Sequence, residues 1–122
     1  MANETVQTVT GAVSVDDLGV TLMHEHLLIG YPGWEANTLE PGPSRDEIIA
    51  VAVDKIASMQ AVGVRSMLDP CPNDLGRDVE LAAEVSSRTG FNIICATGLY
   101  KEDEGGACLL YTSDAADELR SV

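Results

Sequence analysis

The sequence contains few aromatic residues, few basic residues and no long apolar run. Only 4% of its 122 residues are aromatic, and 7 Lys and Arg stand against 20 Asp and Glu, which gives a net charge of −13. Because nucleic acids and anionic membrane surfaces attract basic proteins, this balance argues against either partner. No apolar run approaches the roughly 20 residues of a membrane span, and the N-terminus lacks the basic and apolar regions of a signal peptide.

Cysteine is also scarce. Cys71, Cys95 and Cys108 are odd in number and widely spaced, so they predict neither a disulfide framework nor a CxxC zinc site. We therefore expect a reducing, cytoplasmic location. The apolar content of 45% and charged content of 22% are ordinary for a folded globular chain, and the length fits one small domain.

Histidine occurs only twice, as His24 and His26 in the apolar segment TLMHEHLL. We predict a strand over residues 20–27, where residues i and i+2 project from the same face. Both imidazoles could then face one ion while Glu25 points away. A helical H-E-x-x-H zinc site is excluded, because Leu28 stands where its second His is required.

The two histidines are predicted to be part of a metal site. Zinc binds neutral imidazole nitrogens, and a catalytic zinc site needs about three protein ligands plus an open position. His24 and His26 would supply two of them. The alternative is a pair of hydrogen-bonded structural histidines.

The remaining pattern alternates strands with helices. Capping-box residues Ser44 and Glu47 open the first helix, and Gly63 ends it. Apolar residues at helical spacing predict one buried stripe on the first helix and another on the second: Ile48, Ala52, Ile56 and Met59, then Leu81, Ala82 and Val85. The predicted order is a hairpin of 6–9 and 12–15, strand 20–27, loop 30–43, helix 44–62, strand 64–68, helix 77–89 and strand 91–96.

This order predicts right-handed βαβ units and a parallel sheet. In such sheets ligands gather at the carboxyl ends of the strands. The histidine pair, Asp69 and the pair Thr97-Gly98 all fall at those ends. No glycine-rich phosphate-binding motif follows a strand, so neither dinucleotide nor P-loop binding is predicted.

Several residues near these strand ends have two interpretations. Asp69 is either a partner of a metal-bound His or a cap of the following turn. Arg77 and Asp78 either brace the start of the second helix, where Asp78 suits the helix dipole, or Arg77 contacts a phosphate. Cys71 lies on the loop at this rim and could be taken for a nucleophile, but the sequence has no third His to act as its base.

The other candidates are weaker. Cys95 is interpreted as a small core residue. Tyr31 and Trp34 either line a pocket mouth or cover the core edge. The charged run 101–104 is interpreted as a solvated loop.

The segment TLMHEHL after a short hairpin, followed by LDPCPNDLGRDVELAAEVSSRTGFNIICATGLYKEDEGG, resembles the phosphotriesterase family of the amidohydrolase superfamily. The resemblance runs from about Val6 to Gly106, and the sequence looks most like the less characterised phosphotriesterase-related hydrolases. TatD-like hydrolases also open with H-x-H, but the GRD turn and TGLY argue against them.

The resemblance implies a (β/α)8 barrel with two divalent metals, zinc first among them, at the carboxyl ends of its strands. His24 and His26 would bind the more buried metal, and a metal-bound hydroxide would attack a phosphotriester, a carboxyl ester or a lactone. The family's bridging Lys, later His and late Asp have no counterpart here, because no His follows His26 and the only Lys are Lys55 and Lys101. Catalytic residues are therefore not assigned. The resemblance also implies a small-molecule substrate and allows a homodimer of the full-length parent.

A complete barrel needs about 250 residues, so we expect an N-terminal part of a longer protein. Residues 1–107 would form the first three or so β/α units of a partial (β/α)8 TIM barrel, preceded by a short β-hairpin. Residues 108–122 resemble a non-native tail of translated sequencing-adapter sequence. The alternative function is a truncated, inactive chain with at most weak metal binding.

Overall fold

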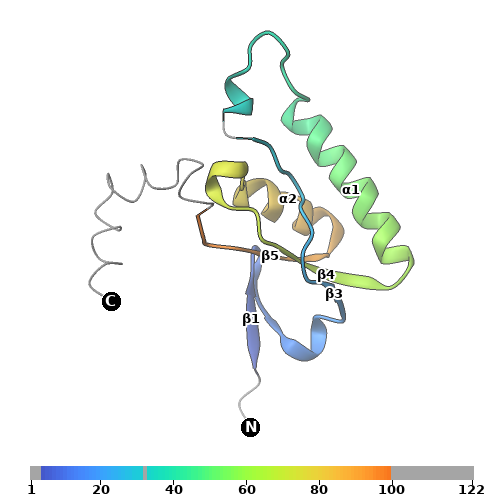
Figure 1. Ribbon diagram of the computed structural model, residues 1–122. Helices are drawn as coiled ribbons and strands as arrows, with labels where there is room; N and C mark the ends of the chain where they lie inside the picture. Colours follow the sequence, from blue (N-terminus) through green and yellow to red (C-terminus); the bar gives the residue numbers. More distant parts are fainter. Residues whose placement is uncertain (1–3, 32, 100–122) are drawn as a thin grey trace, which may run out of the picture.

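The chain folds as a hairpin followed by alternating strands and helices (Figure 1). This computed structural model describes residues 4–31 and 33–99. The strands and helices are β1 (Thr5–Thr8), β2 (Gly11–Ser14), β3 (Val20–Leu22), α1 (Arg45–Ala61), β4 (Val64–Asp69), α2 (Val79–Thr89) and β5 (Asn92–Cys95). Three short 3-10 turns, η1 (Val15–Asp17), η2 (Trp34–Ala36) and η3 (Asn73–Leu75), lie in the connections.

The predicted N-terminal hairpin is confirmed. β1 and β2 pair antiparallel with Thr8 opposite Gly11, so Val9 and Thr10 form the turn, one residue before its predicted place, and Gly11 has φ of 129°. The Thr8 hydroxyl donates to the Gly11 carbonyl oxygen at 2.7 Å. The Val9 amide donates to the Ile93 carbonyl oxygen at 2.9 Å, which fixes the hairpin to β5.

The predicted parallel sheet is also confirmed. Its strand order is β3-β4-β5, and Leu22, Met67 and Ile93 are in register across it. A cluster of buried apolar side chains joins the two helices to this sheet: Ile49, Ala52, Ile56, Met67, Leu81, Ala82, Val85, Phe91 and Ile93. These residues give an α/β fold, and closure of its strands into a (β/α)8 barrel stays a prediction.

The helix boundaries follow local capping chemistry. The Ser44 amide donates to Glu47 Oε2 at 2.8 Å while the Ser44 hydroxyl accepts from the Glu47 amide at 3.3 Å, which confirms the capping box. Within α1, Ile49 is 1% exposed and Ile48 only half-buried, so the buried stripe is displaced by one residue from its predicted start. α2 begins at Val79 because Asp78 caps it, its Oδ1 accepting from the Leu81 amide at 2.8 Å.

The prediction that both histidines lie on a strand was wrong. β3 ends at Leu22, and the backbone bends at Met23 and His24. The Glu25 amide still donates to the Leu68 carbonyl oxygen at 3.1 Å, but the regular ladder with β4 stops. Beyond that point a side chain of β4, and not its backbone, holds the segment.

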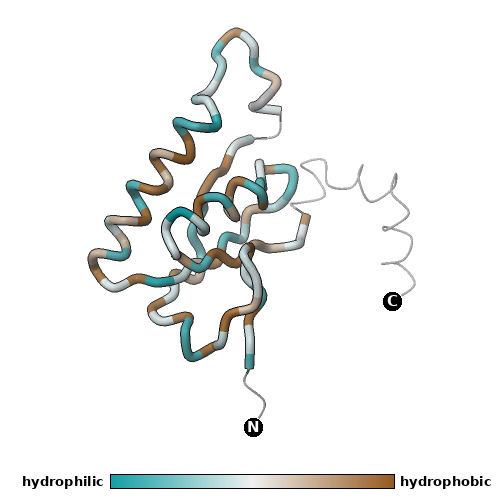
Figure 2. Tube along the Cα trace, turned by 180° about the vertical axis from the view of Figure 1, so that it is seen from behind, coloured by the Kyte–Doolittle hydropathy of each residue, from teal (hydrophilic) through white to brown (hydrophobic). Residues whose placement is uncertain are grey.

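Both edges of the three-stranded sheet lack a further paired strand among the described residues, and apolar side chains on and near α1 are exposed. β3 and β5 each pair with β4 alone, and Val20, Met23, Val51 and Val62 are exposed by 61%, 70%, 59% and 81%. Hydrophobic positions recur along the whole length of α1 (Figure 2). Neither helix is long and apolar enough to cross a lipid bilayer.

Candidate metal centre

His24 and His26 remain neighbours although they follow β3 instead of lying on it. Their ring centroids are 5.1 Å apart and the rings are nearly perpendicular, at 86°. Zn–N bonds of about 2.0–2.1 Å and a ring radius of about 1.1 Å would place two tetrahedral imidazole ligands with centroids about 5 Å apart. The spacing of the pair therefore fits two ligands of one ion.

The His26 ring is oriented by a carboxylate. Its Nδ1 lies 3.2 Å from Oδ1 of Asp69, whose side chain is only 8% exposed, whereas the His26 side chain is 24% exposed. A carboxylate at Nδ1 favours the tautomer that carries its proton there, which leaves Nε2 with a free lone pair. His24 is exposed and has no hydrogen bond to its ring within residues 4–31 and 33–99.

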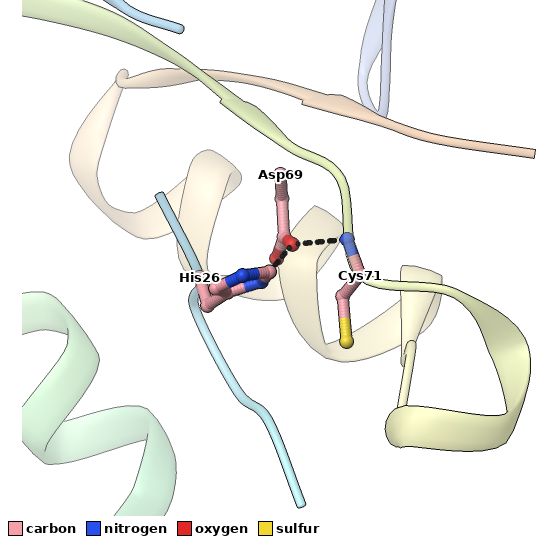
Figure 3. A group of neighbouring side chains, drawn as sticks. All are labelled: His26, Asp69 and Cys71. Atoms are coloured by element: carbon pink, nitrogen blue, oxygen red, sulfur yellow. Dashed lines mark hydrogen bonds and ion pairs between the residues drawn. The ribbon is translucent and has the colours of Figure 1, made fainter. Parts of the chain in front are cut away.

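Asp69 caps the turn after β4, one of the two roles that the sequence allowed, and its carboxylate also contacts the His26 ring. Its Oδ1 accepts from the Cys71 amide at 2.9 Å, which caps the turn after β4, and its Oδ2 accepts from the Leu27 amide at 3.1 Å. In Figure 3 the imidazole of His26 and the Cys71 amide approach the same carboxylate from two segments of the chain. One carboxylate thus fixes the backbone and the ring of the histidine segment.

Cys71 completes a group of three potential ligands with His26 and Asp69, whose ligand atoms all lie within 4.8 Å of one another (Figure 3). The Cys71 thiol is buried and donates to the Leu75 carbonyl oxygen at 3.3 Å. Burial, with the nearby Asp69 charge, raises the pKa of the Cys71 thiol. Because metals bind the thiolate, this group suits a metal less well than the two imidazoles do.

Cys95 is half-buried at the end of β5, close to its predicted place in the core. Burial raises the pKa of Cys95 to about 11, and the Asp69 carboxylate adds to the shift. Such a thiol is almost wholly protonated at neutral pH and is a poor nucleophile.

Arg77 braces the chain after β5, and not the start of α2 as one of its two interpretations predicted, whereas Asp78 caps α2 as predicted. Nη1 of Arg77 donates to the carbonyl oxygens of Ala96 and Gly98, each at 2.9 Å, and so fixes the chain after β5. Asp78 pairs with Arg45 of α1 at 2.8 Å. Nη1 of Arg77 is thus engaged by two backbone carbonyl oxygens, which weakens support for a phosphate contact.

The long loop after the histidines has two aromatic residues with different surroundings. Tyr31 is 87% exposed, whereas Trp34 is half-buried and lies against Gly30, Gly42 and Gly76. Trp34 also lines a cavity of about 600 Å³ with Leu28 and Arg45, which agrees with the pocket interpretation. Sequence patterns could not predict its contact with the glycines, because these come from separate segments. The predicted solvated loop 101–104 lies outside the described residues.

A cavity of about 670 Å³ lies between the histidine segment and α1. Its lining includes Glu25 and His26, with Lys55 from the helix, and is otherwise mostly apolar. His26 therefore contacts Asp69 through Nδ1 while another part of the residue borders this cavity.

Comparison with known proteins is consistent across sequence and structure. The sequence model of the Phosphotriesterase family matches residues 4–120. A phosphotriesterase homology protein of Mycobacterium tuberculosis is 37% identical over 95 residues, covering 78% of this chain and 29% of the relative. The aryldialkylphosphatase of Saccharolobus solfataricus is 30% identical over 92 residues, covering 73% of this chain and 28% of the relative.

A solved structure agrees with these sequences. A variant of a Deinococcus radiodurans PTE-like lactonase superposes with a TM-score of 0.84 at 35% identity, covering 94% of this chain and 37% of that one. The chain thus spans about 29% of the length of the first curated relatives it matches. The family match extends over residues 108–120, outside the described part, so their interpretation as a non-native tail stays a prediction. From the motif, the fold and these matches together, the chain belongs to the phosphotriesterase family.

Proposed function

We propose that this chain supplies the first two metal ligands, His24 and His26, of a zinc-dependent hydrolase that acts on phosphotriester, carboxyl ester or lactone bonds. The observation that carries the proposal is the spacing of the two imidazoles, 5.1 Å between centroids, beside a carboxylate that orients one of them. A divalent metal held there would lower the pKa of a bound water and polarise the bond to be cleaved.

The residues of this chain contribute binding and orientation. His26 would bind through Nε2, since its Nδ1–H donates to the Asp69 carboxylate. His24 would bind from the exposed side. Glu25 stands between them, and its Oε1 accepts from the His26 amide at 3.1 Å, which engages that carboxylate locally.

The substrate class rests on relatives. One is named an aryldialkylphosphatase and another a PTE-like lactonase, which supports ester or lactone hydrolysis by a longer protein. The matches favour this family over the TatD-like alternative. Two imidazoles leave about half of a zinc coordination shell to other ligands. A 122-residue chain with no further His would then bind metal weakly and lack catalysis, which is the second candidate.

Metal titration tests the ligand assignment directly. Zn²⁺ binding by calorimetry and the Co²⁺ absorption spectrum would be compared for the unsubstituted chain, the variants His24→Ala and His26→Ala, and the control Glu25→Gln. We expect binding to be lost in both histidine variants and kept in the control. Binding that survives both histidine changes would refute the assignment.

A second experiment tests the activity. Resequencing the source DNA beyond codon 106 should reveal whether the frame continues with a Lys and further His at later strand ends. The longer product would be assayed on an aryl phosphotriester, an aryl ester and a lactone, with and without a chelator. A frame that ends at residue 122 would favour the inactive alternative.

A further inference from the structure

The histidine segment lies beyond a strand of only three residues, so regular pairing does not hold it in place. Asp69 holds it at His26 and Leu27. A second attachment lies three residues further on. The Gly30 amide donates to the Leu75 carbonyl oxygen at 2.9 Å, and the Cys71 thiol donates to the same oxygen. The end of β4 and the turn after it therefore fix the two ends of the short run 26–30.

Trp34 packs directly on this second attachment. A Cβ built on Gly30 would overlap the indole, lying 2.5 Å from its Nε1, which is closer than real Cβ contacts allow. A Cβ on Gly76 would lie 3.2 Å from Nε1 and 3.8 Å from the Gly30 nitrogen. Gly30, unlike Gly76, does not have a positive φ, so its lack of a side chain is required by space alone.

We propose that Trp34 is a positioning residue for the histidine pair, acting through a clasp that consists of Trp34, Gly30 and Gly76. The indole covers the Gly30–Leu75 hydrogen bond and excludes water from it, which strengthens the bond. The inference rests on the proposed function, because the positioned groups are the proposed metal ligands.

The clasp works by packing. Trp34 Nε1 is buried and has no hydrogen-bond partner in the part of the chain that the structure describes. A flat apolar ring without an N–H should therefore serve nearly as well, whereas removal of the ring should not. This distinction gives the test a conservative variant, Trp34→Phe, beside the disruptive Trp34→Ala.

The experiment uses the metal-free chain first. Amide exchange of Gly30 and the His26 tautomer, read from its ring nitrogen shifts, would be followed by NMR. We expect Trp34→Ala and Gly30→Ala to speed Gly30 exchange by at least about tenfold and to mix the His26 tautomers. Trp34→Phe should retain both features. Gly98→Ala is the matched control, since a Cβ there meets nothing within 4 Å and its φ is not positive.

Zn²⁺ affinity is measured next on the same variants. We expect the Kd to rise by about tenfold in Trp34→Ala and Gly30→Ala, and to stay unchanged in Trp34→Phe and Gly98→Ala. Adding Gly30→Ala to Trp34→Ala should have little further effect, because the added methyl group then has room. Amide protection in α2 serves as the control for intact folding.

The outcomes separate the clasp from the proposed function. Unchanged Gly30 exchange and His26 tautomer in Trp34→Ala would overturn the clasp, and so would an unchanged Kd with exchange accelerated, since Trp34 would then be merely structural. If the unsubstituted chain binds no Zn²⁺ through its histidines, the proposed function fails. The tautomer and exchange data on the metal-free chain then still decide whether Trp34 positions His26.

Discussion

The Nδ1 atom of His26 lies 3.2 Å from Oδ1 of Asp69, at the point where β4 ends and 43 residues after the histidine in the chain. The same carboxylate accepts the Leu27 and Cys71 amides. A single buried acidic residue thus joins the histidine segment to the neighbouring strand, and its removal should affect both stability and metal affinity.

Asp69→Asn should weaken Zn²⁺ binding by about 10- to 100-fold, because the amide cannot orient the His26 ring as a carboxylate does. The buried amides that it serves would also lose part of their hydrogen bonding, which should lower the free energy of unfolding by about 1–3 kcal/mol. Calorimetry and urea unfolding measure the two effects. Asp54→Asn, on the exposed side of α1, is the control and should change neither. Equal effects of the two substitutions would contradict this role.

The capping box should contribute a pH-dependent part of the stability. Hydrogen bonds from Ser44 lower the pKa of Glu47 below its ordinary value of 4.5. A lowered folded-state pKa means that the contribution is fully present well above pH 4.5 and is lost as the pH falls through the folded-state value. The difference in unfolding free energy between the unsubstituted chain and Glu47→Gln should therefore shrink on acidification. A difference that stays constant from neutral pH down to about pH 3 would exclude this contribution of the capping box.

The two thiols near the site should react slowly in the folded chain. A pKa of about 11 for Cys95 in place of 9.0 lowers its thiolate fraction at about pH 8 by about 100-fold. In a Cys108→Ser variant, Ellman's reagent should therefore modify Cys95 at least that much faster in urea than in buffer, and Cys71, whose pKa burial also raises, should likewise react faster in urea. Fast modification in buffer would show that burial does not protect them.

Core burial on α1 should be sharply asymmetric. Ile56 is fully buried, so Ile56→Ala should lower the free energy of unfolding by about 2–5 kcal/mol. Val51, on the same helix, is 59% exposed, and Val51→Ala should change it by at most about 0.5 kcal/mol. Urea unfolding at a few micromolar protein gives both values. Similar losses at the two positions would mean that α1 packs in another orientation.

The edge of β3 that pairs with no other described strand, and the exposed apolar residues on and just after α1, should drive self-association. Open sheet edges template further strands, and Val20 and Val62 are exposed by 61% and 81% there. Sedimentation should show mass rising with protein concentration, and Val20→Lys with Val62→Lys should reduce it. Val79→Lys, at the start of α2, is the control. A monomer with a cooperative thermal transition at about 100 μM would refute the expectation.

The sequence by itself determined the elements whose causes are local. The capping box at Ser44, the helix stop at Gly90 and the apolar run of β5 depend on neighbours a few residues away, so their types and approximate limits could be predicted. The H-x-H motif and its surrounding segments also sufficed to identify the family.

The tertiary structure decided what depends on contacts between distant segments. β3 ends at Leu22 because its pairing with β4 stops there. Asp69 contacts both the Cys71 amide and the His26 ring because the histidine segment approaches the end of β4. The packing of Trp34 on Gly76 likewise joins residues more than 40 positions apart in the sequence. Side-chain periodicity shows which face a residue occupies, but not which distant group meets it there, because that is set by the packing of the whole chain.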